Sequence, residues 1–183
     1  MLYNIYSLCR VLCLQLVEYL RCNHTLNYQE ELTKTITSFR ELNNEENIHR
    51  NTNDIGTLFR SYNKKNHGFS LDNLNGIIHM DIENKWIDVG GKPRYYDIVK
   101  HTLKHKLIPK IVPELSSITV GGAITGISIE SSSFKYGWGH DSVLDMDILT
   151  SSGEVHYATR DNTFSDLFKA IPNSYGTIGY VTR

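Results

Sequence analysis

The chain has 183 residues, 40% of them hydrophobic, with 19 basic and 20 acidic side chains and a net charge of −1. That length allows one ordinary domain, or two small lobes, around a real hydrophobic core. The balanced charge provides no general attraction for a nucleic acid, and the basic residues occur only in short runs, so we expect no nucleic-acid partner.

The first 22 residues resemble an amphipathic helix more than a membrane span. Charged and polar side chains interrupt the apolar run at Arg10, Gln15, Glu18 and Arg21, which makes it a poor spanning segment. No small-residue cleavage site follows, so a secretory signal is also disfavoured. Most polar residues share one arc of the helical projection, which indicates a helix docked on the domain. A membrane-surface anchor and a partner-binding helix are the alternatives.

All three cysteines lie in this first segment, at Cys9, Cys13 and Cys22. Such clustering is not a disulfide framework, and it fits a reducing compartment. We therefore expect a cytoplasmic protein with buried or idle thiols, associated with a membrane if the first helix anchors it. Acylated or metal-binding thiols are the alternative.

The next hundred residues contain patterns for helices and strands. A modest amphipathic helix is indicated by Leu32, Ile36, Phe39 and Leu42, and a polar loop follows it. Strands are predicted over 57–62, 76–81 and 85–89. The last two pair across Glu83–Asn84, and Gly90–Gly91 then ends the strand.

A second helix follows Pro93, which suits a first helical position. Its apolar stripe of period 3.6 consists of Tyr95, Ile98, Val99, Thr102 and Leu103, with basic residues mainly off the stripe. His101 and His105 have a spacing that can chelate a metal on a helix. No third ligand is evident, so we expect a solvated basic face and no metal site.

The C-terminal part predicts a hairpin, a short helix and a last strand. The hairpin joins 143–150 to 154–159 across Ser151–Gly153. Thr163 and Asp166 resemble a capping box for a helix through Ile171, and 177–182 forms the strand. This order predicts an α+β fold of two small lobes, preceded by the N-terminal amphipathic helix, with a long loop at the junction of the lobes.

That long loop is residues 113–137, PELSSITVGGAITGISIESSSFKYG, rich in glycine and serine. Its charged side chains are Glu114, Glu130 and Lys135. The glycine pair in TVGG permits close backbone approach, and the following turn can direct its N–H groups at a phosphate. We expect the loop to wrap an anionic ligand.

A family resemblance strengthens this interpretation. The motifs TVGG, IESSS, KYG, SDLF and GTIG occur in that order. Together they resemble the FAD-binding domain of the vanillyl-alcohol oxidase and p-cresol methylhydroxylase type, and within it the Δ24-sterol reductase group. The resemblance implies an N-terminal helical region over 1–50, outside the match. It implies an FAD-binding domain over 51–183, with FAD between its lobes and no cap domain within this sequence.

The resemblance also implies which residues contact FAD. Backbone donors for the pyrophosphate and ribityl chain are expected at Glu114, Leu115, Ser116, Ser117, Ile118, Thr119, Val120, Gly121 and Gly122. Contacts near the isoalloxazine are expected at Gly126, Ser131 and Ser132, and backbone contacts at Thr177, Gly179 and Val181. A further phosphate loop is matched to 60–65, where a solvated charge run is the alternative. FAD is expected to be non-covalent, because no cysteine lies beyond Cys22 and His67 lies outside the matched loop.

The resemblance implies an FAD-linked oxidoreductase domain that passes hydride to or from a small organic substrate, sterol-like or lipid-like. It identifies no catalytic residue, because the cap domain usually supplies these groups. Two alternatives stay open. One is a flavin-binding module without catalysis of its own, which works with a separate cap subunit, and the other is a decayed fragment.

Overall fold

The computed structural model of the chain describes residues 25–42, 49–50 and 68–183. Several predictions fall outside the described residues: the N-terminal amphipathic helix, the cysteines, the strand at 57–62, the phosphate loop at 60–65, and His67.

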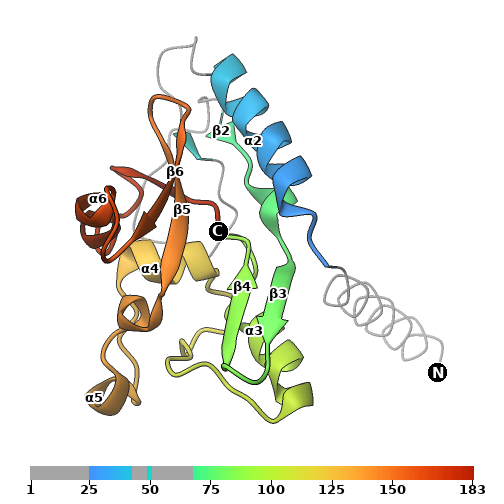
Figure 1. Cartoon of the computed structure of the whole chain (residues 1–183), viewed down its shortest axis with the longest axis vertical. Helices are drawn as coiled ribbons and strands as arrows, with labels where there is room; N and C mark the ends of the chain where they lie inside the picture. Colours follow the sequence, from blue (N-terminus) through green and yellow to red (C-terminus); the bar gives the residue numbers. More distant parts are fainter. Residues whose placement is uncertain (1–24, 43–48, 51–67) are drawn as a thin grey trace, which may run out of the picture.

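Helices and short strands are mixed along the chain (Figure 1). The helices are α2 (Tyr28–Leu42), α3 (Tyr95–Thr102), α4 (Val120–Gly126), α5 (Ser133–Tyr136) and α6 (Ser165–Ala170), with 3-10 turns η2 (Asp72–Leu74), η3 (Leu103–His105) and η4 (Gly139–Ser142). The strands are β1 (His49–Arg50), β2 (Gly68–Phe69), β3 (Ile77–Asp81), β4 (Trp86–Val89), β5 (Asp145–Thr150), β6 (Val155–Thr159) and β7 (Gly179–Val181).

The strands form three small sheets. β1 and β2 pair in parallel, β3 and β4 form an antiparallel hairpin, and β6-β5-β7 is an antiparallel sheet with β5 in the centre. The hairpin turn is closed by the Asp81 carboxylate, which accepts hydrogen bonds from the side chain and the backbone N–H of Asn84, both at 2.8 Å. These bonds lower the pKa of Asp81. The mixed architecture confirms the α+β fold class.

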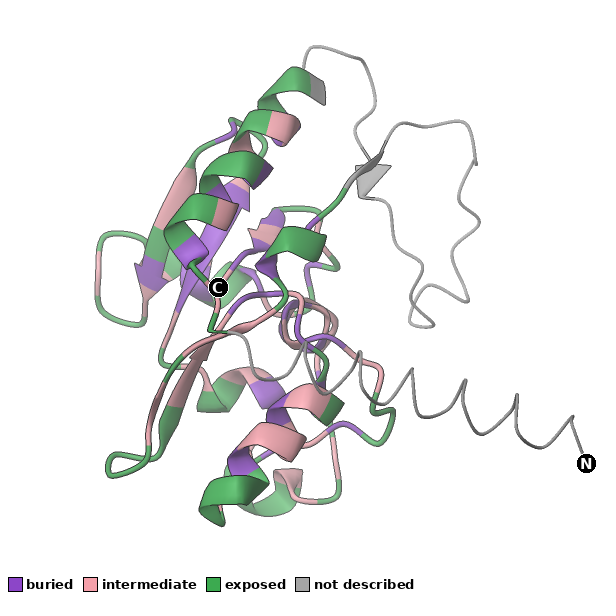
Figure 2. Cartoon of the chain, turned by 90° about the vertical axis from the view of Figure 1, so that its right-hand side faces the viewer, coloured by how far each residue is buried: buried purple, intermediate pink, exposed green. Residues whose placement is uncertain are grey.

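Two hydrophobic clusters lie on opposite faces of β5. Leu149 packs with Tyr28, Leu32 and Phe39 of α2. Ile148 directly precedes Leu149 in the strand, and Met146 lies two residues before Ile148. Both pack with Ile124, Phe168 and Ile171. Alternate residues of a strand point to opposite faces, so β5 is covered by α2 on one side and by α4 and α6 on the other. Figure 2 shows this buried interior in purple.

Helix α2 belongs to this same core. Its buried stripe includes Leu32 and Phe39, as the sequence pattern predicted. Near its C-terminus Arg40 Nη2 donates to the carbonyl of Gly153, in the turn between β5 and β6, at 3.0 Å. A helix that precedes the expected domain start at residue 51 therefore packs as part of the folded unit.

The structure confirms both predicted hairpins and corrects three local expectations. Leu103, placed on the apolar stripe, is 55% exposed, because the last turn tightens into η3. The capping box at Thr163 and Asp166 is wrong. Helix α6 follows Phe164, whose N–H donates to Asn162 Oδ1 at 3.0 Å. The long loop 113–137 also contains two short helices, α4 and α5.

Candidate cofactor-binding site

Helix α4 starts at the TVGG motif, and the protein itself uses the first N–H groups of this helix. The donors and acceptors are Val120 N to Pro93 O at 2.9 Å, Gly121 N to Gly91 O at 2.9 Å, Gly122 N to Thr119 Oγ1 at 3.2 Å and Ala123 N to Thr119 O at 2.9 Å. The bonds from Val120 and Gly121 join α4 to the segment that follows β4, and those from Gly122 and Ala123 close the first turn of the helix on Thr119. The expected contact of this turn with a phosphate stays a prediction.

Gly121 serves close packing between backbones. A Cβ at this position would lie 2.9 Å from Gly91 O and 3.2 Å from Val181 O. Gly91 is tighter still, since its Cβ would lie 2.0 Å from Val181 O, and its N–H donates to Thr182 O at 2.8 Å. We call Gly91, Gly121 and Val181 the glycine junction. It is the point where β4, α4 and β7 meet, and no side chain fits between them.

The other two glycines of α4 face outward. Gly122 and Gly126 are four residues apart, so they lie on one face of the helix. A Cβ at Gly126 would meet only Tyr175 Cε1 at 3.9 Å, and one at Gly122 only Thr119 Oγ1 at 2.9 Å. Both residues are partly exposed. We call Gly122 and Gly126 the glycine stripe, a bare backbone surface against which a flat or extended ligand can lie.

The hydroxyl groups beside the stripe are turned into the helix. Thr119 caps the start of α4, and Thr125 Oγ1 donates to Gly121 O at 2.9 Å. The helix ends at Ile127, which has φ +58°. A β-branched residue in this conformation costs about 1–3 kcal/mol, and such strain gathers at ligand clamps. The strained turn directly follows the stripe.

The remaining residues implied by the resemblance fall into three groups. Glu114, Leu115 and Ser116 are exposed on the loop before α4. The carbonyls of Ser116 and Ile118 accept hydrogen bonds from the first N–H groups of α3, Tyr96 at 3.1 Å and Tyr95 at 2.9 Å. This part of the loop is therefore fixed to α3 and leaves its side chains in solvent.

The second group lies at α5 and the third at β7. Ser131 is exposed, whereas Ser132 Oγ donates to Lys110 O at 2.8 Å. Thr177 Oγ1 donates to Ser174 O at 2.7 Å. Gly179 and Val181 are buried in the sheet. The structure thus brings Thr119, Val120, Gly121 and Val181 together at the glycine junction, while Ser131 and Ser132 lie beyond α4 at the start of α5.

The 174–177 turn also contacts the end of α4. Tyr175 N donates to Thr125 O at 3.0 Å, and the Tyr175 ring lies beside Gly126. Tyr175 has φ +51° and is 53% exposed, so a second strained residue borders the stripe. Tyr175 is not among the residues expected from the sequence, although the GTIG motif directly after it indicates this turn.

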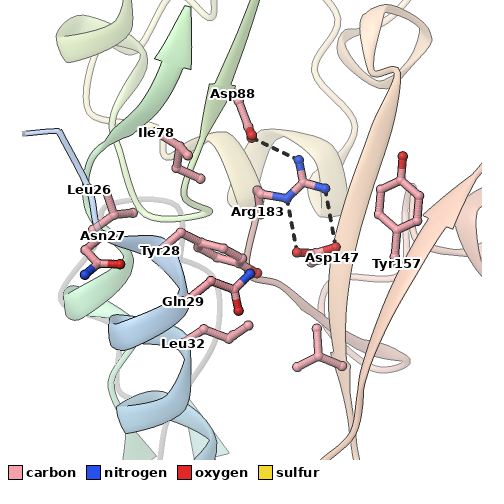
Figure 3. A pocket seen from close by; sticks show the side chains of 11 residues that line it. Leu26, Asn27, Tyr28, Gln29, Leu32, Ile78, Asp88, Asp147, Tyr157 and Arg183 are labelled. Carbon is pink, nitrogen blue, oxygen red and sulfur yellow. Dashed lines mark hydrogen bonds and ion pairs between the residues drawn. The ribbon is translucent and has the colours of Figure 1, made fainter.

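A cavity of about 750 Å³ lies away from these residues, between α2, β3–β4 and β5–β6 (Figure 3). None of the residues assigned to FAD lines it. At its centre the Arg183 guanidinium contacts Asp88 at 3.1 Å, Asp145 at 3.0 Å and Asp147 at 3.1 Å. Burial lowers the pKa of Arg183, but the hydrogen bonds and charges of Asp147 and Asp88 outweigh it and raise the pKa above its usual range.

The cavity wall is also held by a buried tyrosine. Tyr28 OH and Thr182 Oγ1 are 2.9 Å apart, and burial raises the pKa of Tyr28 well above its usual value. Every charged group at the centre has a partner, so this region ties β4, β5 and the end of β7 together. Within the described residues no group of three His, Cys, Asp or Glu side chains is placed to hold a metal ion. The same residues include no helix long and apolar enough to cross a membrane.

Comparison with known proteins agrees with the motif analysis. Residues 54–159 match the model of a family described as an FAD binding domain. Over 109 residues the chain is 39% identical to a Delta(24)-sterol reductase of Pisum sativum, covering 60% of this chain and 19% of that protein. Over 98 residues it is 33% identical to cytokinin dehydrogenase 7 of Oryza sativa subsp. japonica, covering 54% and 18%. The likeness to Δ24-sterol reductases is confirmed, and the chain spans about a fifth of the length of these relatives.

The fold is also found among solved structures. The crystal structure of 6-hydroxy-D-nicotine oxidase from Arthrobacter nicotinovorans superimposes with a TM-score of 0.69 at 22% sequence identity. The match covers 81% of this chain and 32% of that one. At this identity the likeness demonstrates a shared fold. It includes more of the chain than the family model does, in keeping with the packing of α2 into the core.

Proposed function

Since the chain belongs to the family of FAD-binding domains, we propose that it holds FAD without a covalent bond along the glycine stripe of α4. We further propose that it acts as the flavin domain of an oxidoreductase for an organic substrate. The observation that carries the proposal is the open backbone face at Gly126, where a Cβ would meet nothing closer than 3.9 Å. A ligand can approach the chain there without displacing a side chain.

The residues of the chain fit FAD by the shape of the surface that they leave open. FAD, when bound, supplies the hydride chemistry. The glycine stripe offers a side-chain-free surface, and the strained turns at Ile127 and Tyr175 border it. The glycine junction packs α4 against Gly91 after β4 and against Val181 of β7, and this packing positions the stripe. These features bind and orient a cofactor and leave the substrate-contacting groups to other parts of the protein.

The start of α4 also has a consequence for the phosphates. Its first N–H groups already have partners inside the protein, so a pyrophosphate needs a further source of positive charge. We propose that the basic loop at 60–65, which contains Arg60, Lys64 and Lys65, supplies the opposing charge. Arginine and lysine form charge-assisted hydrogen bonds to phosphate oxygens that are roughly twice as strong as neutral ones.

The visible absorption spectrum of the purified chain tests the cofactor site. We expect flavin bands after FAD is supplied, with FAD released on denaturation, as a non-covalent cofactor requires. Gly126→Val should remove these bands and leave the circular dichroism unchanged, because its side chain fills the open face. Ala170→Val, at the exposed end of α6, is the matched control and should keep them. Full FAD binding by Gly126→Val would refute this placement.

A second function, a flavin module completed by a separate cap subunit, is favoured by large apolar side chains that are exposed before and after α4 in the chain. Leu115 is 54% exposed, Ile129 62% and Phe134 91%. A partner covering these side chains would exclude water from the flavin. Anaerobic mixing of the FAD-loaded chain with NADPH separates the two functions. Bleaching of the flavin by the chain alone supports a complete oxidoreductase, and bleaching only with a co-purified partner supports the module.

A further inference from the structure

The basic residues of the chain are concentrated around α3. Between Gly90 and Pro113 the sequence has six lysine or arginine side chains and a single acidic one, Asp97, although the whole chain has a net charge of −1. Lys92 is paired with Asp72 at 3.0 Å. We call the remaining segment, Arg94–Lys110, the basic edge. Nothing in the proposed flavin site uses it.

The fold turns the charges of the basic edge outward. Helix α3 buries Tyr95, Ile98 and Thr102, which leaves the opposite face to solvent. The chain then closes a tight turn in which Lys106 N donates to Leu103 O at 3.0 Å. As a result the exposed residues include Arg94, Lys104, His105, Lys106 and Lys110. Figure 1 shows α3 and the loop after it at the lower end of the molecule.

Large apolar side chains are exposed between these charges. Tyr96 is 46% exposed, Leu103 55% and Ile108 63%. The ammonium group of Lys100 lies 5.6 Å from the centre of the Tyr96 ring. Basic and apolar side chains are therefore exposed together along the basic edge, which is the composition of a surface that lies at a lipid–water boundary.

Acidic groups near the basic edge do not cancel its positive charge. Asp97 lies on α3 itself, and Glu130 is close enough to raise the pKa of Tyr95, although burial is the larger cause. Glu114 is exposed on the loop that is bonded to the start of α3. Three carboxylates stand against the five basic side chains of Arg94, Lys100, Lys104, Lys106 and Lys110, so the basic edge keeps an excess of positive charge.

We infer that the basic edge binds the surface of an anionic phospholipid bilayer. Lysine ammonium groups interact with the negative headgroups, and their alkyl stems cover apolar surface beside them. Leu103 and Ile108 then enter the headgroup boundary. A nucleic acid would use the lysines but would leave these two aliphatic side chains without a role. The inference is independent of the flavin site.

Co-sedimentation of the full chain with vesicles tests the electrostatic part. We expect binding to phosphatidylcholine vesicles that contain phosphatidylserine, much weaker binding to phosphatidylcholine alone, and loss of binding as salt rises. The variant K104Q/K110Q should weaken binding about 25-fold, since each basic residue near an anionic surface contributes about fivefold. The control K85Q/K169Q removes two other exposed lysines and should bind as the parent does.

A second pair of variants tests the contribution of the exposed apolar side chains to vesicle binding. L103S/I108S should also weaken binding, whereas I82S/L144S, which changes two other exposed aliphatic residues, should not. Unchanged circular dichroism identifies folded variants. Equal binding by K104Q/K110Q and the parent would overturn the inference and assign any vesicle binding to another segment, such as residues 1–22. Binding to RNA but not to vesicles would overturn it as well.

Discussion

The glycine junction and the glycine stripe contain the same residue type and serve opposite purposes. At the junction, Gly91 and Gly121 let three backbone segments meet, with a missing Cβ only 2.0–2.9 Å from a carbonyl oxygen. On the stripe, a Cβ at Gly126 would meet only Tyr175 Cε1, at 3.9 Å. One pair removes side chains so that the protein can pack against itself. The other leaves a backbone surface along which we propose that FAD binds. Gly121 and Gly122 are neighbours in one motif, yet Gly121 belongs to the junction and Gly122 to the stripe.

The largest expected effect comes from Gly91→Val. Its Cβ would lie 2.0 Å from Val181 O and 2.9 Å from the Val181 carbonyl carbon, both backbone atoms that cannot give way. We expect a loss of more than about 4 kcal/mol in the free energy of unfolding, which amounts to failure to fold. Yield of soluble protein and circular dichroism measure this. A soluble, native Gly91→Val protein would show that the junction is not the constraint we describe.

Replacing Arg183 tests whether its ion pairs or the backbone packing hold the glycine junction together. Arg183 directly follows Thr182, whose carbonyl accepts the Gly91 N–H. Arg183→Met leaves Asp88, Asp145 and Asp147 without a counter-charge. We expect a loss of about 2–3 kcal/mol by urea unfolding, below the roughly 3–5 kcal/mol of a fully buried pair. The control Arg160→Met, on an exposed side chain, should change stability little. If Arg183→Met and Arg160→Met are equally stable, backbone packing alone holds the junction together.

A pair of alanine variants compares the two glycine sites directly. Gly121→Ala introduces a methyl group 2.9 Å from Gly91 O, and overpacking of this kind costs about 1–3 kcal/mol. Gly126→Ala meets only Tyr175 at 3.9 Å, so the better helix propensity should keep or raise stability by up to about 1 kcal/mol. Urea unfolding measures both. The distinction between junction and stripe fails if the two variants unfold at the same denaturant concentration.

The smallest expected effect is a loss of stability at alkaline pH. Burial, with a contribution from Glu130, raises the pKa of Tyr95 from 10.0 to about 12. The unfolded chain loses this proton first, so stability is complete below pH 10 and falls as the pH rises toward 12. Tyr95→Phe should make this fall shallower in urea unfolding series across that window, leaving the part that comes from Tyr28, whose pKa burial also raises. Tyr96→Phe, next to it and exposed, is the control. A fall of the same steepness in Tyr95→Phe would exclude Tyr95 as its source.

Much of the local structure follows from patterns within short segments. Alternation and a turn at Glu83–Asn84 predicted the β3–β4 hairpin, and Ser151–Gly153 predicted the β5–β6 hairpin, both of which the register confirms. The 3.6-residue period predicted α2 and α3. Motifs in fixed order predicted the FAD-binding family, which the family match confirms. The hairpins and helices depend on neighbours within a few residues, and the family assignment depends on motifs in a fixed order. Both kinds of pattern can be read along the chain.

The direction in which each glycine of TVGG faces depended on the tertiary structure. Gly121 points into the junction because Gly91 and Val181 meet it there, 30 and 60 positions away in sequence. The Arg183 cluster likewise depends on the pairing of β5 with β7, which brings the end of the chain beside Asp147. Leu103 fitted an apolar stripe, yet the tightening of α3 into η3 leaves it in solvent. Local sequence therefore determined the elements and the family. Long-range pairing decided which surfaces are used for packing and which are left for a ligand, because a residue's surroundings are set by segments far from it in the chain.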